Sequence, residues 1–184
     1  MKKLILIHIG GLHASKEPAV IETVLGSCVA VCLYDAAERI GGMNHILLPG
    51  EADLTRFDTA ARYGVNAMEL LINRIAALGG NRHRIVAKAF GGAQILPSIS
   101  KANGMGRKNA DFVLEFLRME RINLVSHDLG GHSPRKVYFH TDTGYAFLKT
   151  LPRISRSRVV SEELKQWVRV RSNSQETGEI TLFD

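Results

Sequence analysis

The chain has 184 residues, of which 45% are apolar and 23% are charged, and this length and composition predict one globular domain with a sizeable core. The formal net charge is +6, but the cations are scattered and no nucleic-acid-reading motif accompanies them. We therefore expect a solvated basic surface that can attract an acidic protein, and no nucleic-acid partner.

The N-terminal half reads mainly as strands. Apolar and β-branched runs predict strands over residues 4–9, 20–23, 28–34 and 41–48, with a loop through 10–18. The polar residues 35–39 lie between two of these strands, so they predict a hairpin. The first apolar run is broken by His8 and Gly10 and lacks a cleavage site, so we interpret it as a strand of a cytoplasmic protein. No apolar run approaches the roughly 20 residues that span a bilayer, and no membrane insertion is expected.

Helical periodicity begins after a polar loop at 51–58. Two amphipathic helices are predicted over 59–78 and 107–120, the first stopped by two glycines. The remaining elements predicted are strands at 84–90 and 122–126, a hairpin of 136–141 with 145–150, and a short helix from Ser161. We expect a single domain over 1–171 and a polar C-terminal tail over 172–184. Because hairpins dominate and two helices must cover one sheet face, the predicted class is α+β, with layered sheets.

The tripeptide Gly26-Ser27-Cys28 is the first candidate for chemistry. A glycine before a cysteine allows a tight turn, and such a turn can direct backbone N–H groups at a carbonyl oxygen. Hydrolysis of an amide by cysteine needs a thiolate, a base and donors for the oxyanion. Cys28 is therefore the candidate nucleophile, while Gly26 and Ser27 would line the oxyanion site; the alternative is an inert core cysteine.

His45 is the candidate base because the hairpin brings it to Cys28. If Asp35 pairs with Ile40, the numbers of paired residues sum to 75 and His45 lies diagonal to Cys28 on one sheet face. A two-residue turn would give a sum of 73 and place His45 directly opposite Cys28. A slip by one residue would separate the two side chains onto opposite faces. A third residue could orient the imidazole, either Thr23 through its hydroxyl or Asn44.

Cys32 lies four residues after Cys28 in the same predicted strand, too far for a disulfide, so both thiols are expected to be free. The pair does not match a zinc-ligand spacing. His127, Asp128 and His132 surround two glycines, but no further ligand set accompanies them. We expect neither a metal nor an organic cofactor.

At this point the pattern resembles a known family. Residues 25–35 (LGSCVAVCLYD) followed by 41–49 (GGMNHILLP) are similar to the CheD family of chemoreceptor glutamine deamidases. The similarity continues through 63–68 (YGVNAM), 88–93 (KAFGGA), 106–110 (GRKNA) and 128–131 (DLGG), from about residue 20 to 151.

The resemblance implies a cysteine-hydrolase fold shared with deamidating toxins, with layered sheets and helices outside. It implies a Cys–His–Thr site at Cys28, His45 and Thr23, acting without cofactor. The implied substrates are glutamines on the cytoplasmic helical bundle of chemotaxis receptors, and the phosphatase CheC is an implied partner. Two rival interpretations are a docking module for CheC with little enzymatic work, and a glutaminase acting on free glutamine.

Overall fold

The computed structural model describes residues 2–95, 104–152 and 155–175, and in this part of the chain it has nine strands and three helices. The strands are β1 (Lys3–Leu6), β2 (Leu12–Ser15), β3 (Ala19–Leu25), β4 (Val29–Asp35), β5 (Ile40–Asn44), β6 (Val86–Gly91), β7 (Asn123–Leu129), β8 (Arg135–His140) and β9 (Ala146–Thr150). The helices are α1 (Thr59–Ala77), α2 (Met105–Met119) and α3 (Arg156–Gln175).

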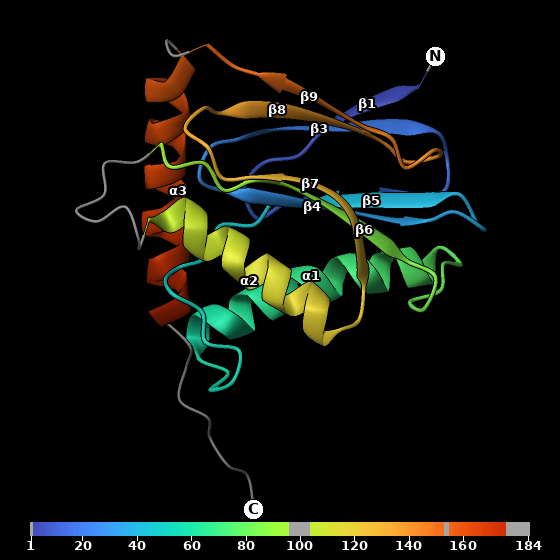
Figure 1. Ribbon diagram of the computed structural model, residues 1–184, viewed down its shortest axis with the longest axis horizontal. Coiled ribbons are helices and arrows are strands. Elements are labelled where there is room, and N and C mark those ends of the chain that lie inside the picture. Colours follow the sequence, from blue (N-terminus) through green and yellow to red (C-terminus); the bar gives the residue numbers. More distant parts are fainter. Residues whose placement is uncertain (1, 96–103, 153–154, 176–184) are drawn as a thin grey trace, which may run out of the picture.

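The elements form three layers (Figure 1). A four-stranded sheet in the order β1-β3-β8-β9 packs on a five-stranded sheet in the order β2-β5-β4-β6-β7. Helices α1 and α2 cover the other face of the five-stranded sheet, and α3 stands across one end of both sheets (Figure 1). Most strand pairs are antiparallel, but β1 with β3 and β6 with β7 are parallel, the latter joined through α2. The predicted α+β class, with layered sheets and helices outside, is confirmed.

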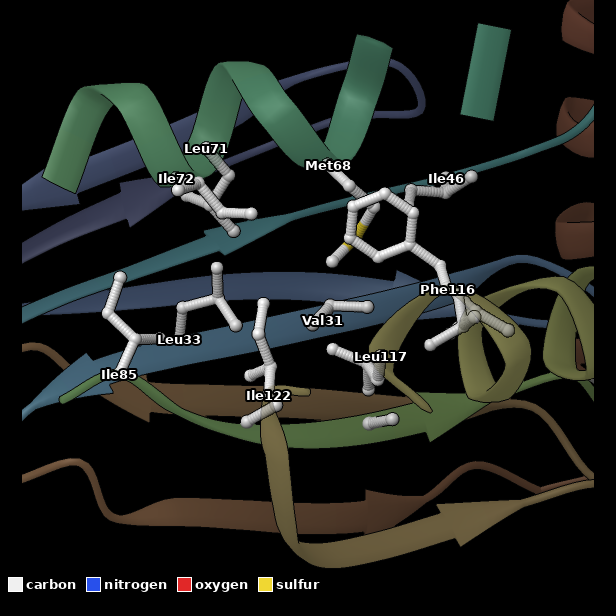
Figure 2. Close-up of a cluster of buried hydrophobic side chains, with 14 of the residues drawn as sticks. Val31, Leu33, Ile46, Met68, Leu71, Ile72, Ile85, Phe116, Leu117 and Ile122 are labelled. Carbon is white, nitrogen blue, oxygen red and sulfur yellow. The ribbon is translucent and has the colours of Figure 1, made fainter. Parts of the chain in front are cut away.

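The helix layer is held by a large apolar core. Met68, Leu71 and Ile72 project from α1 towards Val31 and Leu33 of β4, as Figure 2 shows. These five side chains are almost completely buried, and each contributes about 1.5–3 kcal/mol relative to an exposed position. Packing against α1 therefore holds this face of β4 in place, and β4 is the strand that directly follows Cys28.

A second core lies between the two sheets and contains both cysteines. Cys28 and Cys32 pack there with Ile21, Leu25 and Phe139, among other apolar side chains. Both thiols are free, as expected. The candidate nucleophile thus lies in this apolar core, where solvent does not reach it in this conformation.

The predicted hairpin is confirmed in one of its two registers. Asp35 pairs with Ile40 and Cys32 with Met43, so the residue numbers sum to 75. The bridge between Val29 and Ile46 continues the same register. The register with a sum of 73 is excluded. Because paired positions share a face, Cys28 and His45 lie on the same side of the hairpin, which faces the four-stranded sheet.

Several parts of the chain differ from the sequence expectation. The strand predicted over 41–48 ends at Asn44, so His45 lies just beyond it. Residues 12–15, expected in a loop, form β2 because they complete the edge beside β5. The short helix expected from Ser161 is the 20-residue α3, which begins at Arg156. Residues 172–175, assigned to the polar tail, continue this helix, and 176–184 lie outside the described residues. Among the described helices, none is both long enough and apolar enough to cross a membrane.

Candidate active site

Cys28 lies in the short loop between β3 and β4, and the backbone of that loop is anchored on both sides. Gly92 N–H donates to the Cys28 carbonyl at 2.8 Å, and Ala93 N–H donates to the Gly26 carbonyl at 2.8 Å. Gly91 has φ +112°, and a Cβ there would lie 2.2 Å from the Cys28 carbonyl oxygen. The glycine pair 91–92 is therefore required for the close backbone approach that holds this loop.

Asn109 of α2 anchors the same loop from the helix layer. Its amide nitrogen donates to the Ser27 carbonyl at 2.9 Å, and its oxygen accepts the Leu48 N–H at 3.0 Å. Its side chain is completely buried. One side chain thereby connects the loop before Cys28 to the segment after His45, so it fixes both candidate residues relative to α2.

His45 lies where its strand leaves the ladder with β4. Its N–H donates to the Gly11 carbonyl at 3.0 Å, and its carbonyl accepts from Gly10 N–H at 2.8 Å. Asn44 fills the gap, because its side-chain oxygen accepts the Val31 N–H at 3.0 Å and its nitrogen donates to the Ala67 carbonyl. Asn44 therefore points towards α1 and is not the partner of the imidazole.

Thr23 of β3 is the residue that contacts His45. Its hydroxyl lies 2.8 Å from His45 Nδ1 and also donates to the Ile7 carbonyl at 2.8 Å. A carbonyl only accepts, so the single hydroxyl proton is directed at Ile7 and the Thr23 oxygen accepts Nδ1–H. The neutral imidazole then has its lone pair on Nε2. That atom is buried and has no hydrogen-bond partner among the described residues, so it is available as a base.

The backbone N–H groups of Gly26, Ser27 and Cys28 converge on one point. In this conformation the carboxylate of Glu163, from α3, lies there. Its Oε1 accepts from Gly26 at 3.0 Å and from Cys28 at 3.1 Å, and its Oε2 accepts from Ser27 N–H at 3.0 Å. The Ser27 hydroxyl donates to Oε2 at 2.6 Å. Convergent N–H groups next to a thiol have the geometry of an oxyanion hole.

Burial sets the protonation of the neighbouring groups. Burial lowers the pKa of His45 to about 3, with a smaller contribution from His8, so its imidazole is neutral near pH 7. Burial raises the pKa of the Cys28 thiol well above its usual range, and the Glu163 carboxylate raises it further. Burial also raises the pKa of Cys32. The thiolate character that we expect of Cys28 is therefore suppressed while α3 lies on the site.

Two cavities adjoin His45. One of about 370 Å³ lies between α3 and the sheets and is lined by Thr23, His45 and several α3 residues, Glu162 and Glu163 among them, together with residues of β1 and its following loop. The other, of about 90 Å³, is lined by Gly10, His45 and Tyr63, with neighbouring residues of α1. Space for a reactant thus exists on the α3 side of the imidazole.

Comparison with known proteins places the chain in a family. The family model described as "CheD chemotactic sensory transduction" matches residues 47–150. A Shewanella oneidensis protein named "Probable chemoreceptor glutamine deamidase CheD 1" is 43% identical over 176 residues, covering 95% of this chain and 84% of the relative. A Dechloromonas aromatica protein with the same name is 42% identical over 174 residues, covering 95% and 86%.

The chain belongs to the CheD family. A solved structure of a Neisseria meningitidis protein of the DUF152 family aligns with 72% of this chain and 64% of that one, at 10% identity and a TM-score of 0.40. A likeness this weak adds nothing to the assignment. The resemblance seen in the sequence motifs is therefore confirmed by family model and relatives.

Within this CheD chain, the structure brings together five of the residues that the sequence singled out for chemistry, whereas Asn44 points away towards α1. Cys28 and His45 share a hairpin face, Thr23 contacts the imidazole, and Gly26 and Ser27 present their N–H groups beside the thiol. In residues 2–95, 104–152 and 155–175, no group of three or more His, Cys, Asp or Glu is arranged to hold a metal.

Two residues that contact the loop at 26–28 were not predicted from the sequence as site residues. Asn109 appears in the sequence only as part of the 106–110 motif, since an asparagine in a first helical turn usually serves as a cap. Glu163 was missed because a glutamate on a polar helix carries no pattern that distinguishes it from a solvated residue. Its burial at 2% exposure is a tertiary effect of where α3 lies.

Proposed function

We propose that the protein hydrolyses glutamine side chains of a protein substrate to glutamate and ammonia, with Cys28 as nucleophile and His45 as base. The observation that carries the proposal is the convergence of three N–H groups beside the thiol, next to an imidazole whose Nε2 has no hydrogen-bond partner in the described part of the chain. The names of the relatives, which describe probable chemoreceptor glutamine deamidases, support this choice of reaction.

The first half of the reaction forms a thioester. His45 Nε2 accepts the Cys28 thiol proton, and the thiolate attacks the carboxamide carbon of the glutamine. The oxygen of the tetrahedral intermediate is held by N–H groups of Gly26, Ser27 and Cys28, which are oriented before the reaction begins. The C–N bond breaks, and His45 gives its proton to the departing ammonia.

The second half hydrolyses the thioester. His45 Nε2 accepts a proton from water, whose oxygen attacks the thioester carbon, and the same N–H groups hold the second oxyanion. The C–S bond then breaks, the departing thiolate takes back the proton that His45 Nε2 accepted from water, and glutamate is released. Thr23 keeps the Nδ1–H tautomer through both halves, because its own proton remains committed to the Ile7 carbonyl. Residues of this chain supply the nucleophile, the base and the oxyanion donors in all of these steps.

We propose the cytoplasmic helical bundle of a chemotaxis receptor as the substrate, and the cytoplasm as the compartment in which the two meet. The relatives' names support a receptor substrate. The net charge of +6 favours association with an acidic surface. CheC stays a proposed partner on the family resemblance alone.

The test is mass spectrometry of a purified receptor cytoplasmic fragment after incubation with the protein. Each converted glutamine adds about 1 Da, since a carboxamide becomes a carboxylate. Cys28→Ala and His45→Ala proteins should produce no mass change and no ammonia. Ammonia release that persists in Cys28→Ala would refute the mechanism. Turnover of free glutamine at the same rate as the receptor fragment would show that the substrate is a small molecule and not a protein.

A further inference from the structure

Glu163 is a buried carboxylate in an unusual setting. It is 2% exposed, and none of the ion pairs found among the described residues includes it. Burying a charge without a counter-ion is costly unless hydrogen bonds replace its hydration. Here three backbone N–H groups and the Ser27 hydroxyl supply those bonds, at 2.6–3.1 Å. The loop at 26–28 is therefore a binding site for a carboxylate, and α3 fills it.

The same donors cannot serve two acceptors. In the proposed reaction the N–H groups of residues 26–28 must hold the oxygen of the substrate, yet each already donates to Glu163. The Glu163 carboxylate is also chemically the product of glutamine deamidation, presented from a helix. Its position next to Cys28 corresponds to the place of a newly formed glutamate before release.

Helix α3 is attached by few contacts apart from this carboxylate. Among its described side chains only Val159 and Glu163 are buried. Val159 packs with Ala93 and Ile95, and the Arg156 guanidinium donates to the Ile95 carbonyl at 2.9 and 3.2 Å. Farther along, Trp167 is half-buried against the core between the sheets, whereas Leu164 and Val168 are exposed. An element with so little buried apolar area belongs to the part of a structure that opens most easily.

We propose that α3 is an autoinhibitory helix, which blocks the active site by inserting Glu163 as a mimic of the product into the oxyanion hole. The inference rests on the proposed function, because it assigns the N–H groups of residues 26–28 to the reaction. The active form is the one in which α3 has left, so that a receptor helix can present a glutamine at the same place. Cys28, which is completely buried under α3, then becomes accessible.

The experiment measures the rate at which iodoacetamide labels Cys28 in the full-length protein at neutral pH, by peptide mass. Glu163→Ala should label at least about tenfold faster than wild type, since it loses several hydrogen bonds that close the site. The matched control is Glu162→Ala, which removes the adjacent charge on the same helix. Glu162 is exposed and pairs only with Arg158 at 3.1 Å among the contacts described, so its labelling rate should equal that of wild type.

A second variant weakens the docking of α3 without touching the loop. Arg156→Ala removes the hydrogen bonds to the Ile95 carbonyl, and should raise Cys28 labelling about threefold. Cys32 reports the integrity of the fold, because it lies in the core between the sheets. If Glu163→Ala labels Cys32 as well, that variant has unfolded, and Arg156→Ala decides the question.

Labelling and turnover separate this inference from the proposed function. Faster Cys28 labelling together with faster ammonia release from a receptor fragment supports both. Faster Cys28 labelling with no ammonia from wild type or Glu163→Ala supports α3 as a helix that covers Cys28, and it refutes the deamidase proposal. Unchanged labelling in folded Glu163→Ala and Arg156→Ala overturns the inference, whatever the turnover. Faster labelling with lower turnover also overturns it, because Glu163 would then assist the reaction.

Discussion

Thr23 offers the sharpest test of the proposed catalytic geometry, because its hydroxyl connects the two sheets at the imidazole. It accepts Nδ1–H of His45 and donates to the Ile7 carbonyl, each at 2.8 Å. Thr23→Val replaces the hydroxyl with a methyl group of similar size, so packing between the sheets is retained. Thr23→Ser keeps the hydroxyl and removes only the methyl group, and it is the matched control.

The expected magnitude follows from what the valine leaves unpaired. Both the Ile7 carbonyl and His45 Nδ1–H lose their partner in a buried site, at about 1–3 kcal/mol each in folding free energy. The effect on rate is separate. A base that loses its tautomer control forfeits much of its contribution, which is about 10²–10⁴-fold for general base catalysis. We expect kcat to fall about 100-fold in Thr23→Val, equivalent to about 2.7 kcal/mol in transition-state stabilisation.

The assay is ammonia release from a receptor fragment, with kcat and KM measured separately, alongside denaturant unfolding. Thr23→Ser should keep kcat within about threefold of wild type, while losing up to about 1 kcal/mol in stability through the missing methyl group. A Thr23→Val enzyme with the kcat of Thr23→Ser would refute the role of Thr23 in holding the Nδ1–H tautomer. A change confined to KM would refute it too, since the tautomer acts on the chemical step.

Four further outcomes are expected. Cys28→Ala and His45→Ala should each remove ammonia release with circular dichroism unchanged, whereas Cys32→Ala should keep turnover and cost about 1–2 kcal/mol in urea unfolding; loss of turnover in a folded Cys32→Ala protein would contradict the assignment of the nucleophile. Asn109→Ala leaves the Ser27 carbonyl and Leu48 N–H unpaired, so both kcat and thermal stability should fall, and a loss of stability alone would limit Asn109 to the fold. Raising salt from about 50 to 500 mM should lower kcat/KM on a receptor fragment, because screening weakens attraction to an acidic bundle; no dependence on salt would exclude this attraction. The His45 pKa is about 3 when folded and 6.5 in the reference state, so the unfolded chain binds the extra proton and stability should fall by about 2 kcal/mol from pH 7 to 5; denaturant unfolding of His45→Gln should lack this component, and an equal loss in that variant would contradict it.

The sequence predicted the part of the site that depends on local hairpin geometry, namely the relation of Cys28 to His45. The even turn after Asp35 made the parity of the hairpin predictable, and parity was enough to place Cys28 and His45 on one face. The choice between sums of 75 and 73 could not be made, because the turn residues Ala36 and Ala37 favour neither loop length. Thr23 and Asn44 were both possible partners for the imidazole, and only the contact between the two sheets distinguishes them.

What could not be predicted depends on contacts between segments far apart in the chain. Residues 12–15 are a strand only because β5 offers them an edge. Glu163 reaches Cys28 across 135 positions in sequence, and the polarity of its helix suggested a solvated element. The polar surface of α3 is real, since most of it is exposed. Glu163 is the buried exception on that surface, and a single buried polar position produces no periodicity in the sequence.

The covering of the site also bears on which substrates the enzyme selects. Cys28 is completely buried and the N–H groups of residues 26–28 donate to Glu163, so on the proposed mechanism a substrate must first displace Glu163 and the contacts of Val159 and Arg156. A free glutamine has few atoms with which to provide that binding energy. A receptor helix has an extended surface, and binding energy from parts remote from the reacting amide can be used for displacement. On the proposed mechanism, α3 therefore favours protein substrates over small ones without a separate specificity pocket, because access to the thiol requires a partner as large as the helix that it replaces.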